Sequence, residues 1–202
     1  MSDAQLARNL QRALSDIATA FAIATRTSCR ASIKVLSLVP NAPMVGKKDI
    51  IRFLLVRTFA RDTLREEGDV EEQADYVSEN TDFVELFNDP KESCFFENDL
   101  KKRMSQGQYR NSHLPTGYNT QTDIWPLPYR STIIWPIRRM KQTDSGRPEP
   151  DLLGFLCVDS AARNVFVKRY DRDLGAAFAD ALYMYMVQQP AAFAMAKGGA
   201  NG

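Results

Sequence analysis

The chain has 202 residues, of which 44% are hydrophobic and 25% are charged. This composition is typical of a globular protein with one sizeable core, and it excludes wholesale disorder and a small disulfide-stapled scaffold. Because 26 basic residues stand against 25 acidic ones, the formal charge is only +1, and no global field favours nucleic acid or an anionic membrane as a partner.

The three cysteines, Cys29, Cys94 and Cys157, and the single histidine, His113, are widely and irregularly spaced. This spacing indicates free thiols in a reducing compartment and predicts neither a metal site nor another cofactor. The longest apolar stretch, residues 13–25, is shorter than the ~20 residues that cross a bilayer. With no secretory signal recognisable, we expect a cytoplasmic protein without a membrane partner.

The first three elements are predicted from hydrophobic periodicity. Residues 3–25 predict a helix, because apolar residues recur every three or four positions, and Ser2 followed by Gln5 matches a capping box. Residues 29–39 and 49–62 predict two strands. A turn rich in proline and glycine separates them, so we expect an antiparallel hairpin. The helical stripe consists of Leu6, Leu10, Leu14, Ile17, Phe21 and Ala24.

The middle of the chain is predicted to be irregular. Residues 62–75 hold seven acidic side chains and predict a solvated loop. Asn80 stands at the start of a short capped helix, and residues 94–96 predict a short strand. Residues 101–128 contain several glycines and prolines together with aromatic residues, which favours a long ordered loop.

Two further strands and a helix close the predicted fold. Residues 129–138 predict one strand, and the unbroken apolar run in residues 151–160 predicts a strand near the middle of the sheet. Residues 171–187 predict a helix, and residues 188–202 a disordered tail. The apolar stripe expected on the last helix consists of Leu174, Ala177, Phe178, Ala181, Leu182 and Tyr185.

The order of these elements resembles that of a GAF domain. The resemblance is carried by the segments YRSTIIWPIR and DLLGFLCVDS, through Ser131, Pro136, Gly154, Leu156, Asp159 and Ser160. It implies an α+β fold with a central antiparallel sheet of five or six strands and the N- and C-terminal helices on one face. Residues 1–27 would form the N-terminal helix, residues 28–187 the GAF-like domain and residues 188–202 the tail.

The resemblance also suggests roles for individual residues. Gly154 is expected to let a helix approach the sheet, and Asp159 to accept hydrogen bonds from the turn that follows it. Asp173 and Leu174 would open the last helix, as in the family.

The functional subtypes of the GAF family are matched poorly. The chain lacks the Asn-Lys-x-x-x-Phe signature of cyclic-nucleotide binding, and Cys94 has no nearby histidine of the kind found at tetrapyrrole attachment sites. The family's free-methionine-sulfoxide reductase places its reactive cysteine just before the strand that begins here at Tyr129, where this chain has none. We therefore expect no catalytic residue.

Several residues admit a structural and a functional interpretation. Cys157 lies in an apolar strand and is expected to be an inert core residue, and the acidic neighbours Glu92 and Glu97 would raise the pKa of Cys94. His113 is expected at the surface. The basic clusters at residues 101–103 and 138–141 could bind an anion or simply be solvated, and the aromatic residues could line a cavity or fill a closed core.

The function that these patterns favour is a non-catalytic sensory or regulatory module that binds a small molecule over the sheet. The predicted ligand-binding residues are Phe83, Phe87, Phe95, Tyr129, Ser131 and Ile133. The alternative is a protein-interaction module with an occluded pocket, and an enzyme similar to the sulfoxide reductase comes third. We also expect a homodimer through the terminal helices, with the apolar contacts made by Ala20, Ile23, Tyr183, Met184 and Met186.

Overall fold

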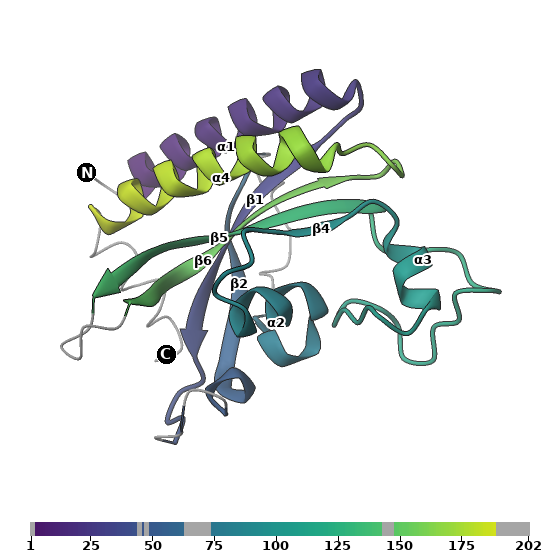
Figure 1. The fold of residues 1–202 in the computed structure, drawn as a ribbon, viewed down its shortest axis with the longest axis horizontal. Helices are drawn as coiled ribbons and strands as arrows, with labels where there is room; N and C mark the ends of the chain where they lie inside the picture. The colour runs from purple at the N-terminus through teal and green to yellow at the C-terminus, as the bar shows by residue number, and fades with distance from the viewer. Residues whose placement is uncertain (1–2, 44–45, 47–48, 63–73, 143–147, 189–202) are drawn as a thin grey trace.

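The computed structural model describes residues 3–43, 46, 49–62, 74–142 and 148–188. It is an α+β fold in which one six-stranded antiparallel sheet, of order β3-β2-β1-β6-β5-β4, separates two layers of helices (Figure 1). This confirms the predicted fold class. The acidic segment 63–73 and the tail from residue 189 onward lie outside the described residues, as does Ser2 of the predicted capping box.

The helices are α1 (Asp3–Thr25), α2 (Thr81–Asn88), α3 (Leu100–Ser105) and α4 (Lys168–Val187), with 3-10 turns η1 (Ile50–Phe53) and η2 (Val77–Glu79). The strands are β1 (Arg30–Leu38), β2 (Leu54–Arg61), β3 (Asp75–Tyr76), β4 (Phe95–Glu97), β5 (Ser131–Gln142) and β6 (Pro148–Ser160). No described helix combines the length and the apolar character needed to cross a membrane.

The two terminal helices lie side by side and antiparallel on one face of the sheet, as expected (Figure 1). Leu10, Leu14 and Phe21 of α1 are buried against side chains that alternate along the strands, including Ile33 of β1 and Trp135 of β5. Neither helix would be stable alone in water, so this shared apolar core holds both in place.

Strand β6 lies between β1 and β5, which confirms the central position predicted from its apolar run. The role expected for Gly154 is wrong. A Cβ atom at this position would lie 2.0 Å from the carbonyl oxygen of Lys34 on β1. Gly154 therefore admits the backbone of the neighbouring strand, not a helix.

The glycine that lets a helix approach the sheet is Gly175 of α4. A Cβ atom there would lie 2.1 Å from the ring of Trp135, and the indole Nε1 donates a hydrogen bond to the carbonyl oxygen of Arg172 at 2.8 Å. Because Gly175 must face the sheet, α4 is rotated relative to the predicted stripe. Tyr183 and Met186 are consequently buried, contrary to expectation, and Leu174 is 37% exposed.

Three predicted boundaries also differ. Helix α4 begins at Lys168, before Asp173, and its first turn is closed by Asp171, whose Oδ2 accepts a hydrogen bond from the Val167 amide at 2.6 Å. The segment predicted as a strand from residue 49 begins as η1. The predicted loop 101–128 starts as α3, because Asp99 Oδ1 accepts a hydrogen bond from the Lys102 amide.

The other face of the sheet is covered by α2, α3 and the loop 106–130 (Figure 1). Its core is aromatic, and the rings of Phe83 and Phe155 stand 4.7 Å apart between centroids. Tyr109 brings the loop into this second core, and Trp125 and Tyr129 pack against it.

Candidate functional site

The sheet face beneath α2 becomes polar at one end. The strand register places Arg30 of β1, Asp159 of β6 and Thr132 of β5 side by side, on the same face as Cys157 and Ile134. Thr132 Oγ1 donates a hydrogen bond to Asp159 Oδ1 at 2.5 Å. Within the described part of the chain, the other carboxylate oxygen of Asp159 accepts none. Asp159 was expected to accept hydrogen bonds from the turn that follows it, but it accepts one from Thr132 on the neighbouring strand β5 instead.

Lys34 projects from β1 on this same face. Its Nζ donates a hydrogen bond to Thr58 Oγ1 on β2 at 3.1 Å. No carboxylate of the described residues lies within ion-pair distance of Lys34, although its charge lowers the pKa of the nearby carboxyl groups of Asp82 and Asp159. Lys34 is therefore a partly buried cation with hydrogen-bonding capacity to spare.

Two carboxyl groups of this region have raised pKa values. Asp82 of α2 is 3% exposed. Its Oδ1 accepts a hydrogen bond from the Phe83 amide at 2.8 Å, and its Oδ2 accepts one from the Tyr109 hydroxyl at 3.3 Å. Burial raises the pKa of Asp82 to about 6 and that of Asp159 to about 6, against the lowering effect of these hydrogen bonds and of Lys34.

Two tyrosines complete the polar cluster, which we define as Lys34, Asp82, Tyr109, Tyr129 and Asp159. The Asn111 side-chain amide donates to the hydroxyls of Tyr109 at 3.0 Å and of Tyr129 at 3.4 Å. Burial and the neighbouring carboxylates raise the pKa of both phenols well above the usual value. Both hydroxyls therefore stay protonated and can donate hydrogen bonds.

The structure divides the six predicted ligand-binding residues between two faces. Phe83, Phe87, Phe95 and Tyr129 belong to the core beneath α2, beside the polar cluster. Ile133 packs in the core beneath α1 and α4 instead. These six side chains do not line one cavity.

The cause is the alternation of side chains along β5. In that strand the even-numbered Thr132 and Ile134 face α2, so Ser131 and Ile133 face the other way. The Ser131 hydroxyl hydrogen-bonds the carbonyl oxygens of Asn98 and Ala162, each at 2.8 Å. It therefore holds two loops together.

Sequence reasoning included Tyr129 but missed Lys34, Asp82, Tyr109 and Asp159 as members of the site. Lys34 lies on the more polar face of its strand, Asp159 ends the apolar run of its strand, and Asp82 precedes an apolar helical face; these positions were the available signal. Their proximity could not be read from the sequence, because Lys34 and Asp159 are separated by most of the chain.

The remaining candidate residues have structural partners. All three cysteines are buried, and burial raises the pKa of each thiol. His113 is at the surface, with its Nε2 3.0 Å from Asp75 Oδ2. Asn80 does not cap α2 with its side chain. Among the residues described, no group of three or more potential ligands is placed to hold a metal ion.

The basic clusters contain side chains that are already paired. Arg103 forms an ion pair with Glu85 at 2.6 Å, and Lys141 forms one with Asp151 at 2.5 Å. Arg138 donates a hydrogen bond to the carbonyl oxygen of Glu92 at 2.7 Å. These contacts favour the structural interpretation over an anion site.

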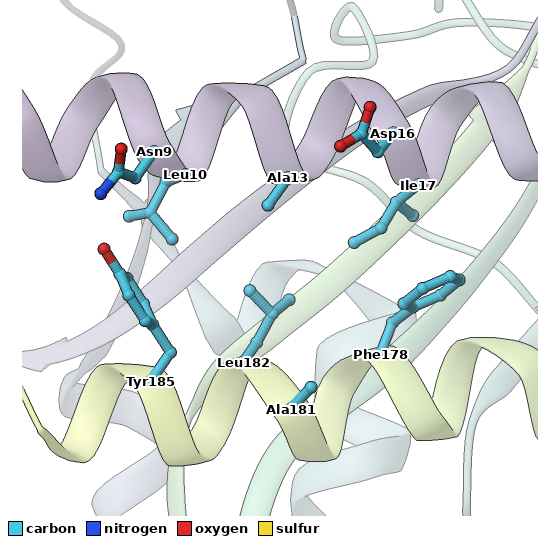
Figure 2. A pocket seen from close by; sticks show the side chains of 9 residues that line it. All are labelled: Asn9, Leu10, Ala13, Asp16, Ile17, Phe178, Ala181, Leu182 and Tyr185. Atoms are coloured by element: carbon cyan, nitrogen blue, oxygen red, sulfur yellow. The ribbon is translucent and has the colours of Figure 1, made fainter.

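A second feature is an apolar groove of about 420 Å³ between α1 and α4 (Figure 2). Ala13 faces Ala181 and Leu182 across its middle, and Ile17 faces Phe178 at one end. The groove is lined by Asn9, Leu10, Ala13, Asp16, Ile17, Phe178, Ala181, Leu182 and Tyr185.

Comparison with known proteins yields only structural similarities. No family model and no curated protein matches it. Among solved structures, it is similar to a type II free methionine-R-sulfoxide reductase from Thermoplasma acidophilum, with a TM-score of 0.47 and 15% identity over 94% of this chain and 96% of that chain.

It is also similar to a domain of a protein described as a two-component sensor histidine kinase from Sinorhizobium meliloti 1021. That comparison has a TM-score of 0.38 and 14% identity over 89% of this chain and 92% of that chain. At these scores, neither likeness assigns an activity or a ligand to this chain.

Proposed function

We propose that the chain is a non-catalytic sensory or regulatory module that binds a small molecule on the α2 side of the sheet. The binding surface would combine the apolar side chains of Phe83, Phe87 and Phe95 with the polar groups of Lys34 and Asp159. The observation that carries the proposal is the polar cluster itself, in which ionisable groups adjoin an aromatic core without direct ion pairing among them.

Ligand sites commonly join an apolar floor to a few orienting polar groups, and ionisable groups with perturbed pKa values gather at such sites. Among the described residues, Lys34 donates to Thr58 alone, so its ammonium group has further N–H groups to offer. Within the same residues, one carboxylate oxygen of Asp159 accepts no hydrogen bond. The cluster therefore offers both a donor and an acceptor to a bound molecule.

The non-catalytic part of the proposal rests on the state of the cysteines. Cysteine chemistry requires an accessible thiolate, and Cys29, Cys94 and Cys157 are buried with raised pKa values. The burial and raised pKa values of these thiols therefore argue against the mechanism of a cysteine-dependent sulfoxide reductase.

The test is native mass spectrometry of the purified chain, followed by a thermal-shift screen against small metabolites. We expect a retained or stabilising molecule whose binding is lost in the Lys34→Met and Asp159→Asn variants. Arg8→Met is the control, because it removes an exposed charge from α1 on the opposite face. A wild-type chain that binds nothing, or variants that bind as tightly as the wild type, would contradict the proposal.

The groove between α1 and α4 supports a second candidate function, self-association. Ile23 is 74% exposed and Met184 is 53% exposed on these two helices, and Leu174 of α4 is 37% exposed. Such apolar groups are favoured at interfaces, and two-fold pairing is the commonest symmetric arrangement. We propose a homodimer through this surface.

Light scattering across a dilution series tests the dimer. The Leu174→Glu and Met184→Glu double variant is expected to be monomeric at concentrations where the wild type is dimeric. Ile124→Glu is the control, because Ile124 is 90% exposed in the loop 106–130. A wild type that is monomeric throughout would end this proposal, and a double variant that still dimerises would refute the choice of surface.

A further inference from the structure

We propose that residues 109–113, hereafter the strap, are the gate of the polar cluster. In this proposal, release of the strap from the start of α2 opens the cluster to solvent while the core beneath α1 and α4 stays closed. The inference rests on the proposed function, because it concerns access to the same site.

The strap is fastened to the start of α2 by hydrogen bonds. The Arg110 amide donates to Thr81 Oγ1 at 2.8 Å, and the Thr81 amide donates to the carbonyl oxygen of Arg110 at 3.1 Å. The amide and hydroxyl of Ser112 both donate to Asn80 Oδ1, at 3.1 and 3.2 Å. Asn80 thus uses its side chain to hold the strap instead of capping α2.

The last contact that holds the strap is the one between His113 and Asp75. Burial alone would raise the pKa of Asp75, but its interactions with His113, together with those of Ser112 and Lys34, outweigh this effect and lower the pKa. The His113 side chain is 55% exposed, so this contact lies at the surface. It joins the end of the strap to β3.

One strap side chain, Tyr109, reaches the core. It is 2% exposed, its ring centroid lies 6.3 Å from that of Phe95, and its hydroxyl donates to Asp82. Arg110 and His113 are exposed, and the remaining strap residues are partly buried. A segment held by one buried aromatic side chain and a few hydrogen bonds, some exposed and some partly buried, has the features of regions that open by local unfolding.

The rest of the loop has its own stabilising contacts. The Asn119 amide donates to Asp123 Oδ2 at 2.8 Å, and the Asp123 amide donates to the carbonyl oxygen of Asn119 at 2.9 Å. These bonds do not involve the strap. Opening of the strap is therefore expected to leave the turn at 119–123 folded.

The three buried cysteines report on the two faces separately. Cys157 lies in the core beneath α2, and its pKa is raised first by burial and then by Asp159. Cys29 and Cys94 lie in the core beneath α1 and α4. Local opening of the strap would expose Cys157 alone, whereas global unfolding would expose all three thiols.

The experiment measures the rate of thiol labelling by a disulfide reagent under native conditions, with each cysteine resolved by peptide mass spectrometry. Asn80→Ala removes the acceptor of both Ser112 hydrogen bonds and is expected to accelerate labelling of Cys157 about tenfold. His113→Ala removes the single surface contact between His113 and Asp75 and is expected to accelerate labelling of Cys157 about twofold.

Thr122→Ala is the matched control, because it removes a hydrogen bond to Asp123 in the same loop but outside the strap. Labelling of Cys29 and Cys94 is expected to stay at the wild-type rate in every variant. Equal acceleration of all three cysteines would show general loosening and overturn the gate. Unchanged labelling of Cys157 in both strap variants would overturn it too, whereas failure of the wild type to bind any molecule would refute the proposed function instead.

Discussion

The two faces of the sheet are built in different ways. The face beneath α1 and α4 is covered by helices of 23 and 20 residues, and a large apolar cluster packs beneath them, with the buried Ser131 and Asp171 as polar exceptions. The face beneath α2 is covered by helices of eight and six residues and a long loop, with buried ionisable groups at its polar end. The difference indicates that the first face supplies stability and the second supplies a site, because buried carboxyl groups and short covering elements reduce stability.

The largest change in stability is expected from truncating one aromatic side chain on each face. Trp135→Ala is expected to lower the free energy of unfolding by about 4 kcal/mol, because it removes a fully buried side chain beneath α4. Phe83→Ala on the other face is expected to cost about 3 kcal/mol, since α2 and the loop can relax into the space. Urea denaturation measures both, and a larger cost for Phe83→Ala would reverse the assignment of the two faces.

The next test concerns how closely α4 approaches the sheet. Gly175→Ala is expected to cost about 2 kcal/mol through its clash with Trp135, even though alanine is the better helix former. Asp180→Ala, at an exposed position of the same helix, should change stability by less than about 0.5 kcal/mol. The same denaturation experiment compares them, and a stabilised Gly175→Ala variant would show that this contact is not tight.

The buried carboxyl group of Asp82, on the face beneath α2, should make the stability of the protein depend on pH. Because the folded pKa of Asp82 is raised to about 6, this group stabilises the fold fully below its unfolded pKa. That contribution is lost as the pH rises through the folded value.

Relative to the wild type, Asp82→Asn should therefore be more stable at about pH 8 than at about pH 5, by about 1 to 2 kcal/mol. Thermal unfolding across this range measures the difference. Asp180→Asn serves as the exposed control and should show no such change. A pH-independent difference for Asp82→Asn would mean that the carboxyl is not held in a site that disfavours its charge.

The smallest effect is expected at the surface contact between His113 and Asp75. His113→Gln should lower the free energy of unfolding by about 0.5 kcal/mol, because a polar contact between partly exposed side chains contributes little. The lowered pKa of Asp75 makes its contribution present above the unfolded pKa and lost as the pH falls through the folded one. The cost of the variant should therefore shrink in strong acid, and a cost that grows there would contradict this account.

Local periodicity determined the long helices and strands, whereas the short α3 and β3 were not predicted. The three-and-four spacing in α1, the alternation in β1 and the apolar run in β6 all predicted the elements found, because burying a face imposes a repeat that is readable along the chain. The hairpin of β1 and β2 was predicted from the turn between them, and the shared face of the terminal helices was implied by the resemblance to a GAF domain.

Tertiary structure alone decided which face each residue occupies and what it meets there. Helix α4 carries apolar residues on two stripes, and only the contact of Gly175 with Trp135 selects the one that is buried. Ser131 and Ile133 were assigned to the wrong side because alternation defines two faces without saying which of them α2 covers. Lys34, Asp82 and Asp159 come together only when distant strands and a helix pack, so no local pattern in the sequence could place them in one cluster.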